Sequence, residues 1–195
     1  MSILSESLEH TTISDLVHVY VAPVGTKNFD LKTFNFTGED IGAWKWLGDT
    51  SSESLPEFER DDDKDSSKRT ADRKNTRNTS KMTGTITALS LSKRFFELVT
   101  SGGIAEEDGY VVTASTGGRD WAVMIVSEDG GIVDALELYY ANLSTSAIKK
   151  FDLENYSSVS VKVAVYADKQ GRMYKAHYAT KRTVAPAAAV PGVGG

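Results

Sequence analysis

Cysteine is absent from this chain of 195 residues, and so are long apolar runs. Without cysteine, the chain can form no disulfide framework, cysteine-ligated zinc site, iron–sulfur cluster or cysteine nucleophile. No apolar stretch approaches the roughly 18 residues that span a bilayer. Residues 1–15 carry acidic side chains where a signal peptide would have a basic region followed by an apolar stretch. We therefore expect a soluble protein that is made in a cytoplasm and does not insert into a membrane.

An excess of basic charge is also lacking. Lys and Arg together number 22, Asp and Glu number 27, and the formal net charge is -5. A chain with this balance gains no general counterion-release attraction to nucleic acid, which argues against a tight DNA wrapper. Hydrophobic residues at 40% and charged residues at 25% are ordinary globular values and exclude a wholly disordered or fibrous chain. The length predicts one folded domain.

Motifs that carry catalytic or metal chemistry are missing too. The histidines His10, His18 and His177 lie in three different segments, without the His–Glu spacing of a helical zinc site. The run 61–65 clusters carboxylates, but it lacks the alternating ligands, the central Gly and the distal Glu of a calcium loop. No glycine pair lies between a strand and a helix, as a phosphate-binding loop requires. We therefore expect no enzyme activity, no metal and no cofactor.

Alternation of apolar and polar residues is the strongest local signal. In residues 158–166 every second residue is valine, which predicts a half-buried antiparallel strand. A turn composition at 168–171 and aromatic residues in 172–179 then predict a hairpin with that strand.

A second hairpin is predicted around the turn at 127–131, between strands at 121–126 and 132–140. The segment 132–140 also fits a helical stripe, but the Asp-Gly turn and the aromatic and β-branched content favour a strand. Further strands are expected at four places. These are 17–22, 44–47, 82–91 and 110–115.

One helix is predicted over residues 93–99. Ser90 and Ser92 can cap it, the apolar positions 91, 95, 98 and 99 have helical spacing, and the glycines at 102–103 can end it. One short amphipathic helix beside seven or eight strands predicts a mostly β fold. The expected architecture is a β-sandwich or open barrel with one flanking helix.

Three regions are expected: an N-terminal arm at 1–15, a β domain at 16–182 and a flexible Ala, Gly and Pro-rich arm at 183–195. Within the domain, residues 61–80 have no apolar side chain except Ala71, which predicts a long polar loop. Acidic residues come first in this loop and basic residues follow. Its charged residues are the candidate contacts between subunits: Asp61, Asp62, Asp63, Asp65, Lys68, Arg69, Arg73, Lys74 and Arg77.

Trp44 and Trp46 open an alternative reading. Two residues apart on a strand, they share one face, and exposed aromatic rings on a β-sandwich can stack on sugars. The other interpretation is that both rings belong to the core. A carbohydrate-binding module therefore stays open as a second class of function.

The order of several segments resembles that of the major tail (tail tube) proteins of long-tailed phages, particularly those of actinobacteria. The resemblance extends over about residues 40 to 167. Its first pieces are residues 44–51 (WKWLGDTS) and 55–60 (LPEFER), followed by the long polar segment, the Thr-rich strand and the short helix. The later pieces are residues 121–126 (WAVMIV), 135–141 (ALELYYA) and the closing valine-alternating strand.

This resemblance implies a structural virion protein with a β-sandwich subunit and no catalytic step. Subunits of the family join into hexameric rings, and rings stack into a tube through which DNA passes without specific binding. The implied partners are further copies of this chain, the tape measure protein, and the tail-tip and tail terminator proteins. The implied location is the virion tail. A head–tail connector ring protein is the alternative within the structural class.

A free subunit with open strand edges stays soluble only if its assembly is delayed. We expect the 61–80 loop and both arms to be disordered in the monomer and to order between rings. An acidic block can then meet a basic block on the next copy, so stacking is expected to weaken as salt rises.

Overall fold

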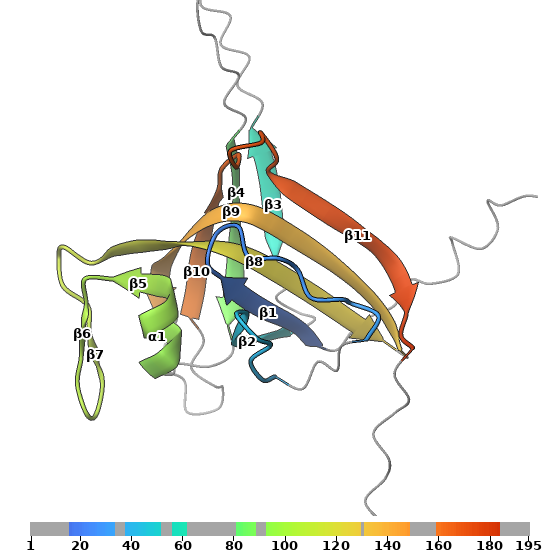
Figure 1. Cartoon of the computed structure of the whole chain (residues 1–195). Coiled ribbons are helices and arrows are strands. Elements are labelled where there is room, and N and C mark those ends of the chain that lie inside the picture. The colour runs from blue at the N-terminus through green and yellow to red at the C-terminus, as the bar shows by residue number, and fades with distance from the viewer. Residues whose placement is uncertain are drawn as a thin grey trace, which may run out of the picture.

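The computed structural model describes residues 16–33, 38–51, 56–61, 81–88, 93–129, 131–148 and 159–183. These residues form a mostly β fold with one short helix (Figure 1). The eight longer strands are β1 (Leu16–Ala22), β2 (Lys45–Ser51), β3 (Glu57–Asp61), β4 (Lys81–Ala88), β8 (Gly117–Asp129), β9 (Ile132–Ile148), β10 (Val159–Val165) and β11 (Tyr174–Lys181). The shorter elements are α1 (Lys93–Val99), β5 (Thr100–Ser101), β6 (Ile104–Ala105) and β7 (Tyr110–Val111). In the described part of the chain, no helix is long and apolar enough to cross a membrane.

Most of the strands belong to one antiparallel sheet with the order β2-β1-β8-β9-β10-β4-β3. The long strand β9 is its centre, because two strands share one of its edges. β10 pairs with the second half of β9, from Val165 opposite Ala141, and β11 pairs with the first half, from Tyr174 opposite Leu138. The sheet curls so that β2 and β4, which are not neighbours in the strand order, pack against each other. The result is the expected sandwich-like fold.

Two hydrophobic cores pack against this sheet. The first core lies inside the curl and combines the valines of β1 and β10 with Met82, Ile86 and Leu143. Helix α1 closes it with Phe95 and Val99, one turn apart on the same helix face. The second core lies on the other face, where the segment between β1 and β2 covers Tyr20, Met124 and Val126. Burial on both faces explains why β8 carries a continuous apolar run, 121–126, instead of alternation.

The structure confirms several expectations. The valine-alternating segment is β10, with Val161, Val163 and Val165 buried, and the turn near Gly131 joins the antiparallel strands β8 and β9. The ambiguous segment 132–140 is a strand, as predicted. Residues 17–22, 44–47 and 82–91 overlap β1, β2 and β4. The helix spans Lys93–Val99, although its predicted caps Ser90 and Ser92 lie outside the described residues.

The predicted hairpin of residues 158–179 is wrong. The turn at 168–171 exists, with the Gly171 N–H donating to the Asp168 carbonyl at 2.9 Å, but β10 and β11 do not pair with each other. Both run antiparallel to β9, so they point in the same direction. The segment 166–173 is therefore an excursion between two halves of one edge, because β9 is long enough to accommodate both strands.

Two smaller predictions also fail. The strand expected at 110–115 is only the two-residue β7, because Thr113 and Thr116 form a turn in which the Thr116 N–H donates to the Thr113 carbonyl. The glycines at 102–103 do not end helix α1. The chain passes directly into β5 at Thr100, and Gly102, with a φ of 80°, turns the chain after that strand.

Candidate functional site: the assembly surfaces

Open strand edges are the first surface feature of the fold. Among the described strands, β2, β3 and β11 each pair with one neighbour: β1, β4 and β9 respectively. β11 is the most exposed of them, and Tyr178 in its bulge is 91% exposed. An edge strand presents unpaired N–H and C=O groups that another chain can complete. The described sheet thus has several edges whose backbone groups could pair with a further strand.

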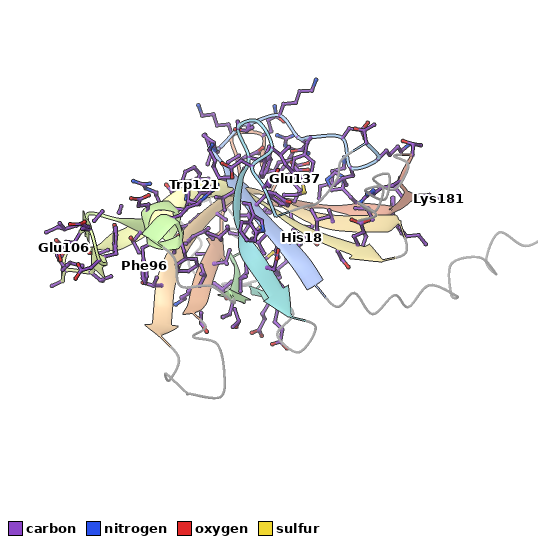
Figure 2. All side chains as sticks on the ribbon, turned by 90° about the horizontal axis from the view of Figure 1, so that it is seen from below. His18, Phe96, Glu106, Trp121, Glu137 and Lys181 are labelled. Atoms are coloured by element: carbon purple, nitrogen blue, oxygen red, sulfur yellow. The ribbon has the colours of Figure 1, made fainter. Side chains whose placement is uncertain are left out.

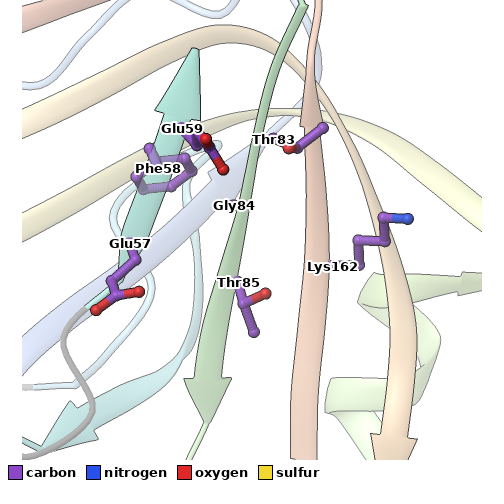
Figure 3. A pocket seen from close by; sticks show the side chains of 7 residues that line it. All are labelled: Glu57, Phe58, Glu59, Thr83, Gly84, Thr85 and Lys162. Carbon is purple, nitrogen blue, oxygen red and sulfur yellow. The ribbon is translucent and has the colours of Figure 1, made fainter. Parts of the chain in front are cut away.

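A polar face covers the outside of β3, β4 and β10. Register places Glu57 opposite Thr85 and Thr85 opposite Lys162, so that these three side chains form one row across the strands. The next row contains Glu59 and Thr83. All five side chains are exposed (Figure 3). These side chains, together with Phe58 and Gly84, line an open depression of about 580 Å³.

Glycine at position 84 allows the edge strand β3 to pack closely against β4. Phe58, on the core side of β3, lies against Gly84, and a Cβ at that position would run into the Phe58 ring and the Glu57 carbonyl. Phe58 packs against the first core. Its ring therefore holds the edge strand β3 onto β4, while Glu57 and Glu59 face outward. The prediction missed strand β3, although the alternation of Glu57, Phe58 and Glu59 is the signal that could have found it.

The predicted contact residues of the 61–80 loop fall almost entirely outside the described residues. Asp61 is the last residue of β3, and its backbone pairs with that of Lys81 at the start of β4. The remaining candidates lie outside: Asp62, Asp63, Asp65, Lys68, Arg69, Arg73, Lys74 and Arg77. The pairing shows that the loop leaves and re-enters the sheet at adjacent positions. The contacts made by the loop stay a prediction.

A buried carboxylate connects the edge strand β11 to the body of the fold. Glu137 on β9 is 4% exposed, and its Oε2 accepts a hydrogen bond from Asn28 Nδ2 at 2.6 Å. His177 Nε2 on β11 lies 3.0 Å from the same oxygen. One carboxylate oxygen thus ties together β9, β11 and the segment that covers the second core.

A second carboxylate joins three elements on the helix side. The Asp40 side chain accepts hydrogen bonds from Lys45 Nζ and from the Trp46 N–H, each at 3.0 Å, and forms an ion pair with Arg94 of α1. Partial burial opposes its ionisation, but these donors and the Arg94 charge hold the pKa of Asp40 below its usual value. The carboxylate therefore works as a structural anchor.

The structure also places a histidine and the two tryptophans that were considered from the sequence as functional residues. His18 Nδ1 lies 2.7 Å from Asp49 Oδ1, across the β1–β2 pair, and His10 lies outside the described residues. Among the described residues, no three His, Asp or Glu side chains are grouped so that they could hold a metal ion. Trp44 is 2% exposed and belongs to the second core, with half-buried Trp46 packed against that core. The two indoles are not an exposed sugar-stacking pair.

Helix α1 and the hairpin that follows it form a projection on one side of the sheet (Figure 1). The last helical turn is held by β8, because Trp121 Nε1 donates to the Leu98 carbonyl at 2.5 Å and Arg119 donates to the Glu97 carbonyl. The hairpin β6–β7 then extends outward, with the acidic residues 106–108 at its tip.

Comparison with known proteins identifies the family of this chain. A family model described as phage tail tube protein matches residues 9–190, which is most of the chain. A search of curated proteins found no match. The extent of the family match covers every element of the sheet, from β1 to β11. The chain therefore belongs to the phage tail tube protein family.

Proposed function

We propose that this chain is the tail tube subunit of a long-tailed phage of the siphovirus type, and that it polymerises into stacked hexameric rings. It acts as a structural component of the virion tail and performs no catalytic step. The observation that carries the proposal is the family match over residues 9–190, on a fold whose described sheet leaves three longer strands with one neighbour each. The resemblance of the sequence to the tail proteins of actinobacterial phages supports the same proposal.

In a ring, the open strand edges of each subunit would pair with neighbouring subunits. A strand edge left exposed invites uncontrolled aggregation, whereas identical neighbours in a closed ring satisfy every edge once. Edge β11 is suited to this because both its faces are largely exposed while its register to β9 is held by the Glu137 contact. The closed ring is the unit that then stacks into a tube.

Ring stacking is proposed for the charged loop between β3 and β4. The loop leaves the sheet where Asp61 pairs with Lys81, at the end of an edge strand. Its acidic residues precede its basic residues, so the acidic block of one copy can meet the basic block of a copy in the next ring. Contacts of this kind between exposed charges are screened by salt.

The tube would serve as the conduit for genome delivery. The polar face of β3, β4 and β10 suits a channel wall, since the carboxylates of Glu57 and Glu59 outnumber the single cation among the described residues of the face, Lys162, and its remaining exposed side chains are uncharged threonines. Carboxylates repel phosphates within about 10 Å at ordinary ionic strength. We assign this face to the lumen. The tape measure, tail-tip and tail terminator proteins are the proposed virion partners, and synthesis would take place in the host cytoplasm.

Electron microscopy tests the proposal directly. Purified full-length protein at high concentration, with and without a tail-tip complex as nucleus, is expected to form hollow tubes or stacked rings. A sample that stays monomeric under both conditions would contradict the proposal. A single terminal ring per virion, measured as copy number, would instead indicate the head–tail connector alternative.

Deletion of residues 62–80 tests the role of the loop. The variant is expected to fold and to form rings that stack poorly, and wild-type tubes are expected to shorten as salt is raised. Normal tubes from the deletion variant would remove the loop from the proposal while leaving the tube itself.

A further inference from the structure

The hairpin β6–β7 carries an unusual combination of exposed side chains. Its tip contains Glu106, Glu107 and Asp108, all exposed, and in the described part of the chain none of the three has an ion-pair partner. Beside them, Ile104 is 56% exposed, and Val111 of β7 and the next residue, Val112, are also exposed. Apolar side chains gathered on a projecting element, rimmed by charge, are typical of a surface that another protein covers.

The base of this hairpin is held rigidly against helix α1. The ring of Tyr110 stacks on that of Phe96, with centroids 5.4 Å apart and planes 9° apart, and the Tyr110 hydroxyl accepts a hydrogen bond from Thr100 Oγ1 at 2.9 Å. Gly103 leaves room for the same ring, since a Cβ there would collide with it. The Glu106 N–H donates to the Gly109 carbonyl at 2.9 Å and closes the tip. The hairpin is therefore pre-organised, which lowers the entropy cost of docking.

The opposite end of the subunit has the opposite charge. Residues 168–182, which comprise the turn before β11, β11 itself and Arg182, contain five Lys and Arg side chains and one Asp. Arg172 and Arg182 pair with Asp168 and Glu128, which leaves three exposed lysines as the basic groups of this end: Lys169, Lys175 and Lys181. Lys175 and Lys181 are exposed, and neither has an ion pair with a described residue. The exposed rings of Tyr174 and Tyr178 lie on the same strand. Figure 2 shows Glu106 and Lys181 at opposite ends of the molecule.

We propose that the β6–β7 hairpin of one subunit docks on β11 of the next copy around the ring. The carboxylates at the tip would face Lys175 and Lys181. The exposed apolar side chains of the hairpin, Ile104, Val111 and Val112, would cover the exposed tyrosines. This inference rests on the proposed function, because it names the contact that builds the ring. Both complementary surfaces belong to the same chain, which favours a second copy over an unrelated partner.

The geometry of the two surfaces also suits a ring. Two different patches at opposite ends of one subunit form a head-to-tail contact, which closes into a ring when the rotation per subunit permits. A patch paired with itself would stop at a dimer. Complementary charge would set the register of each contact and speed the encounter of subunits.

Cysteine cross-linking tests the contact, because the chain has no cysteine of its own. The double variant Asp108→Cys with Lys181→Cys, assembled into tubes and treated with a short bifunctional maleimide, is expected to give a ladder up to the hexamer on a denaturing gel. Each single variant is the matched control and should give no species beyond a dimer. Tubes of the double variant that show no ladder would overturn the proposed contact.

Charge reversal provides a second test that does not depend on cysteine chemistry. The variant Glu106→Lys, Glu107→Lys, Asp108→Lys is expected to raise the concentration needed for assembly at least tenfold. Adding Lys175→Glu and Lys181→Glu is expected to restore assembly, which a folding defect would not permit. Assembly unchanged by the first reversal, or a loss that the second does not restore, would overturn the contact. In either case normal tubes from the wild-type chain keep the proposed function intact, and only their absence contradicts it.

Discussion

Glu137 offers the sharpest test of how the edge strand β11 is held. Truncation by Glu137→Ala removes the oxygen that Asn28 and His177 contact at 2.6 and 3.0 Å. Leaving buried polar partners unsatisfied costs about 1–3 kcal/mol, and the partial exposure of both partners places the effect toward the lower end of that range. For a chain of this size each kcal/mol lowers the melting temperature by about 2–4 °C, so a cost of about 1–2 kcal/mol lowers it by about 2–8 °C.

Two measurements on the subunit check this expectation. Calorimetry gives the melting temperature, and hydrogen exchange is expected to show faster exchange at the β11 amides that pair with β9 while the β10 amides stay protected. The isosteric variant Glu137→Gln keeps an acceptor oxygen in place and should lose less than half as much stability. Glu59→Ala, on the exposed polar face, should stay within about 0.5 kcal/mol of wild type.

A Glu137→Ala variant with the same melting temperature as the Glu59→Ala control would refute this role of Glu137. It would also be refuted if exchange rose equally in β10 and β11, because the loss would then be global and Glu137 would not anchor β11 in particular.

Three further predictions follow from the packing and the charges. Leu143→Ala, at a fully buried position in the first core, should cost about 2–5 kcal/mol by chemical denaturation, and a loss under 1 kcal/mol would contradict its place there. The pKa of Asp40 is lower in the folded state than in the unfolded state. The ionised carboxylate therefore stabilises the fold above the unfolded pKa of about 3.9, and this stabilisation is lost as pH falls through the folded pKa. The stability gap between wild type and Asp40→Asn, under about 1 kcal/mol at neutral pH, should therefore close below about pH 4, and a gap that widens in acid would refute the assignment. Gly103→Ala should displace the Tyr110 ring and speed hydrogen exchange in residues 104–111. Gly109→Ala is the control, because a Cβ at Gly109 would have no atom within 4 Å, and it should not change the exchange. Equal exchange in both variants would contradict the proposed packing of Tyr110 against helix α1.

Local patterns were enough to predict most of the strands. The valines of residues 158–166 and the Asp-Gly turn before β9 indicate their structure directly, because alternation and turn chemistry act between residues close in sequence. Helix α1 was predicted for the same reason, from Phe95, Leu98 and Val99. Its last residue, Val99, was also predicted, but the cause of its end was not, because β5 begins at Thr100 and the glycines at 102–103 follow that strand.

The errors arose where two distant segments compete for one partner. Residues 172–179 have the pattern of a strand, yet nothing in that pattern says whether β10 or β9 is its neighbour. The turn at Asp168 was present and suggested a hairpin. β9 has seventeen residues and is long enough to pair with both β10 and β11 along one edge, so β11 pairs with β9 and not with β10.

The candidate site divides in the same way. The charge blocks of the 61–80 loop are a property of the sequence, and they remain a prediction. The acidic tip at 106–108 and the lysines of β11 can also be identified from the sequence. Their positions at opposite ends of the molecule cannot, because these positions depend on where β8 and β9 lie between them (Figure 2).

By itself the sequence determined the class of fold, its turns, the absence of cysteine chemistry and the resemblance to tail tube proteins, because each depends on residue type and near-neighbour spacing. Only the tertiary structure decided which edges stay open, that Trp44 is buried, and that Glu137 anchors the strand beside it. These features come from contacts between residues far apart in the chain, such as Asn28 and Glu137, and long-range pairing leaves no mark on local periodicity.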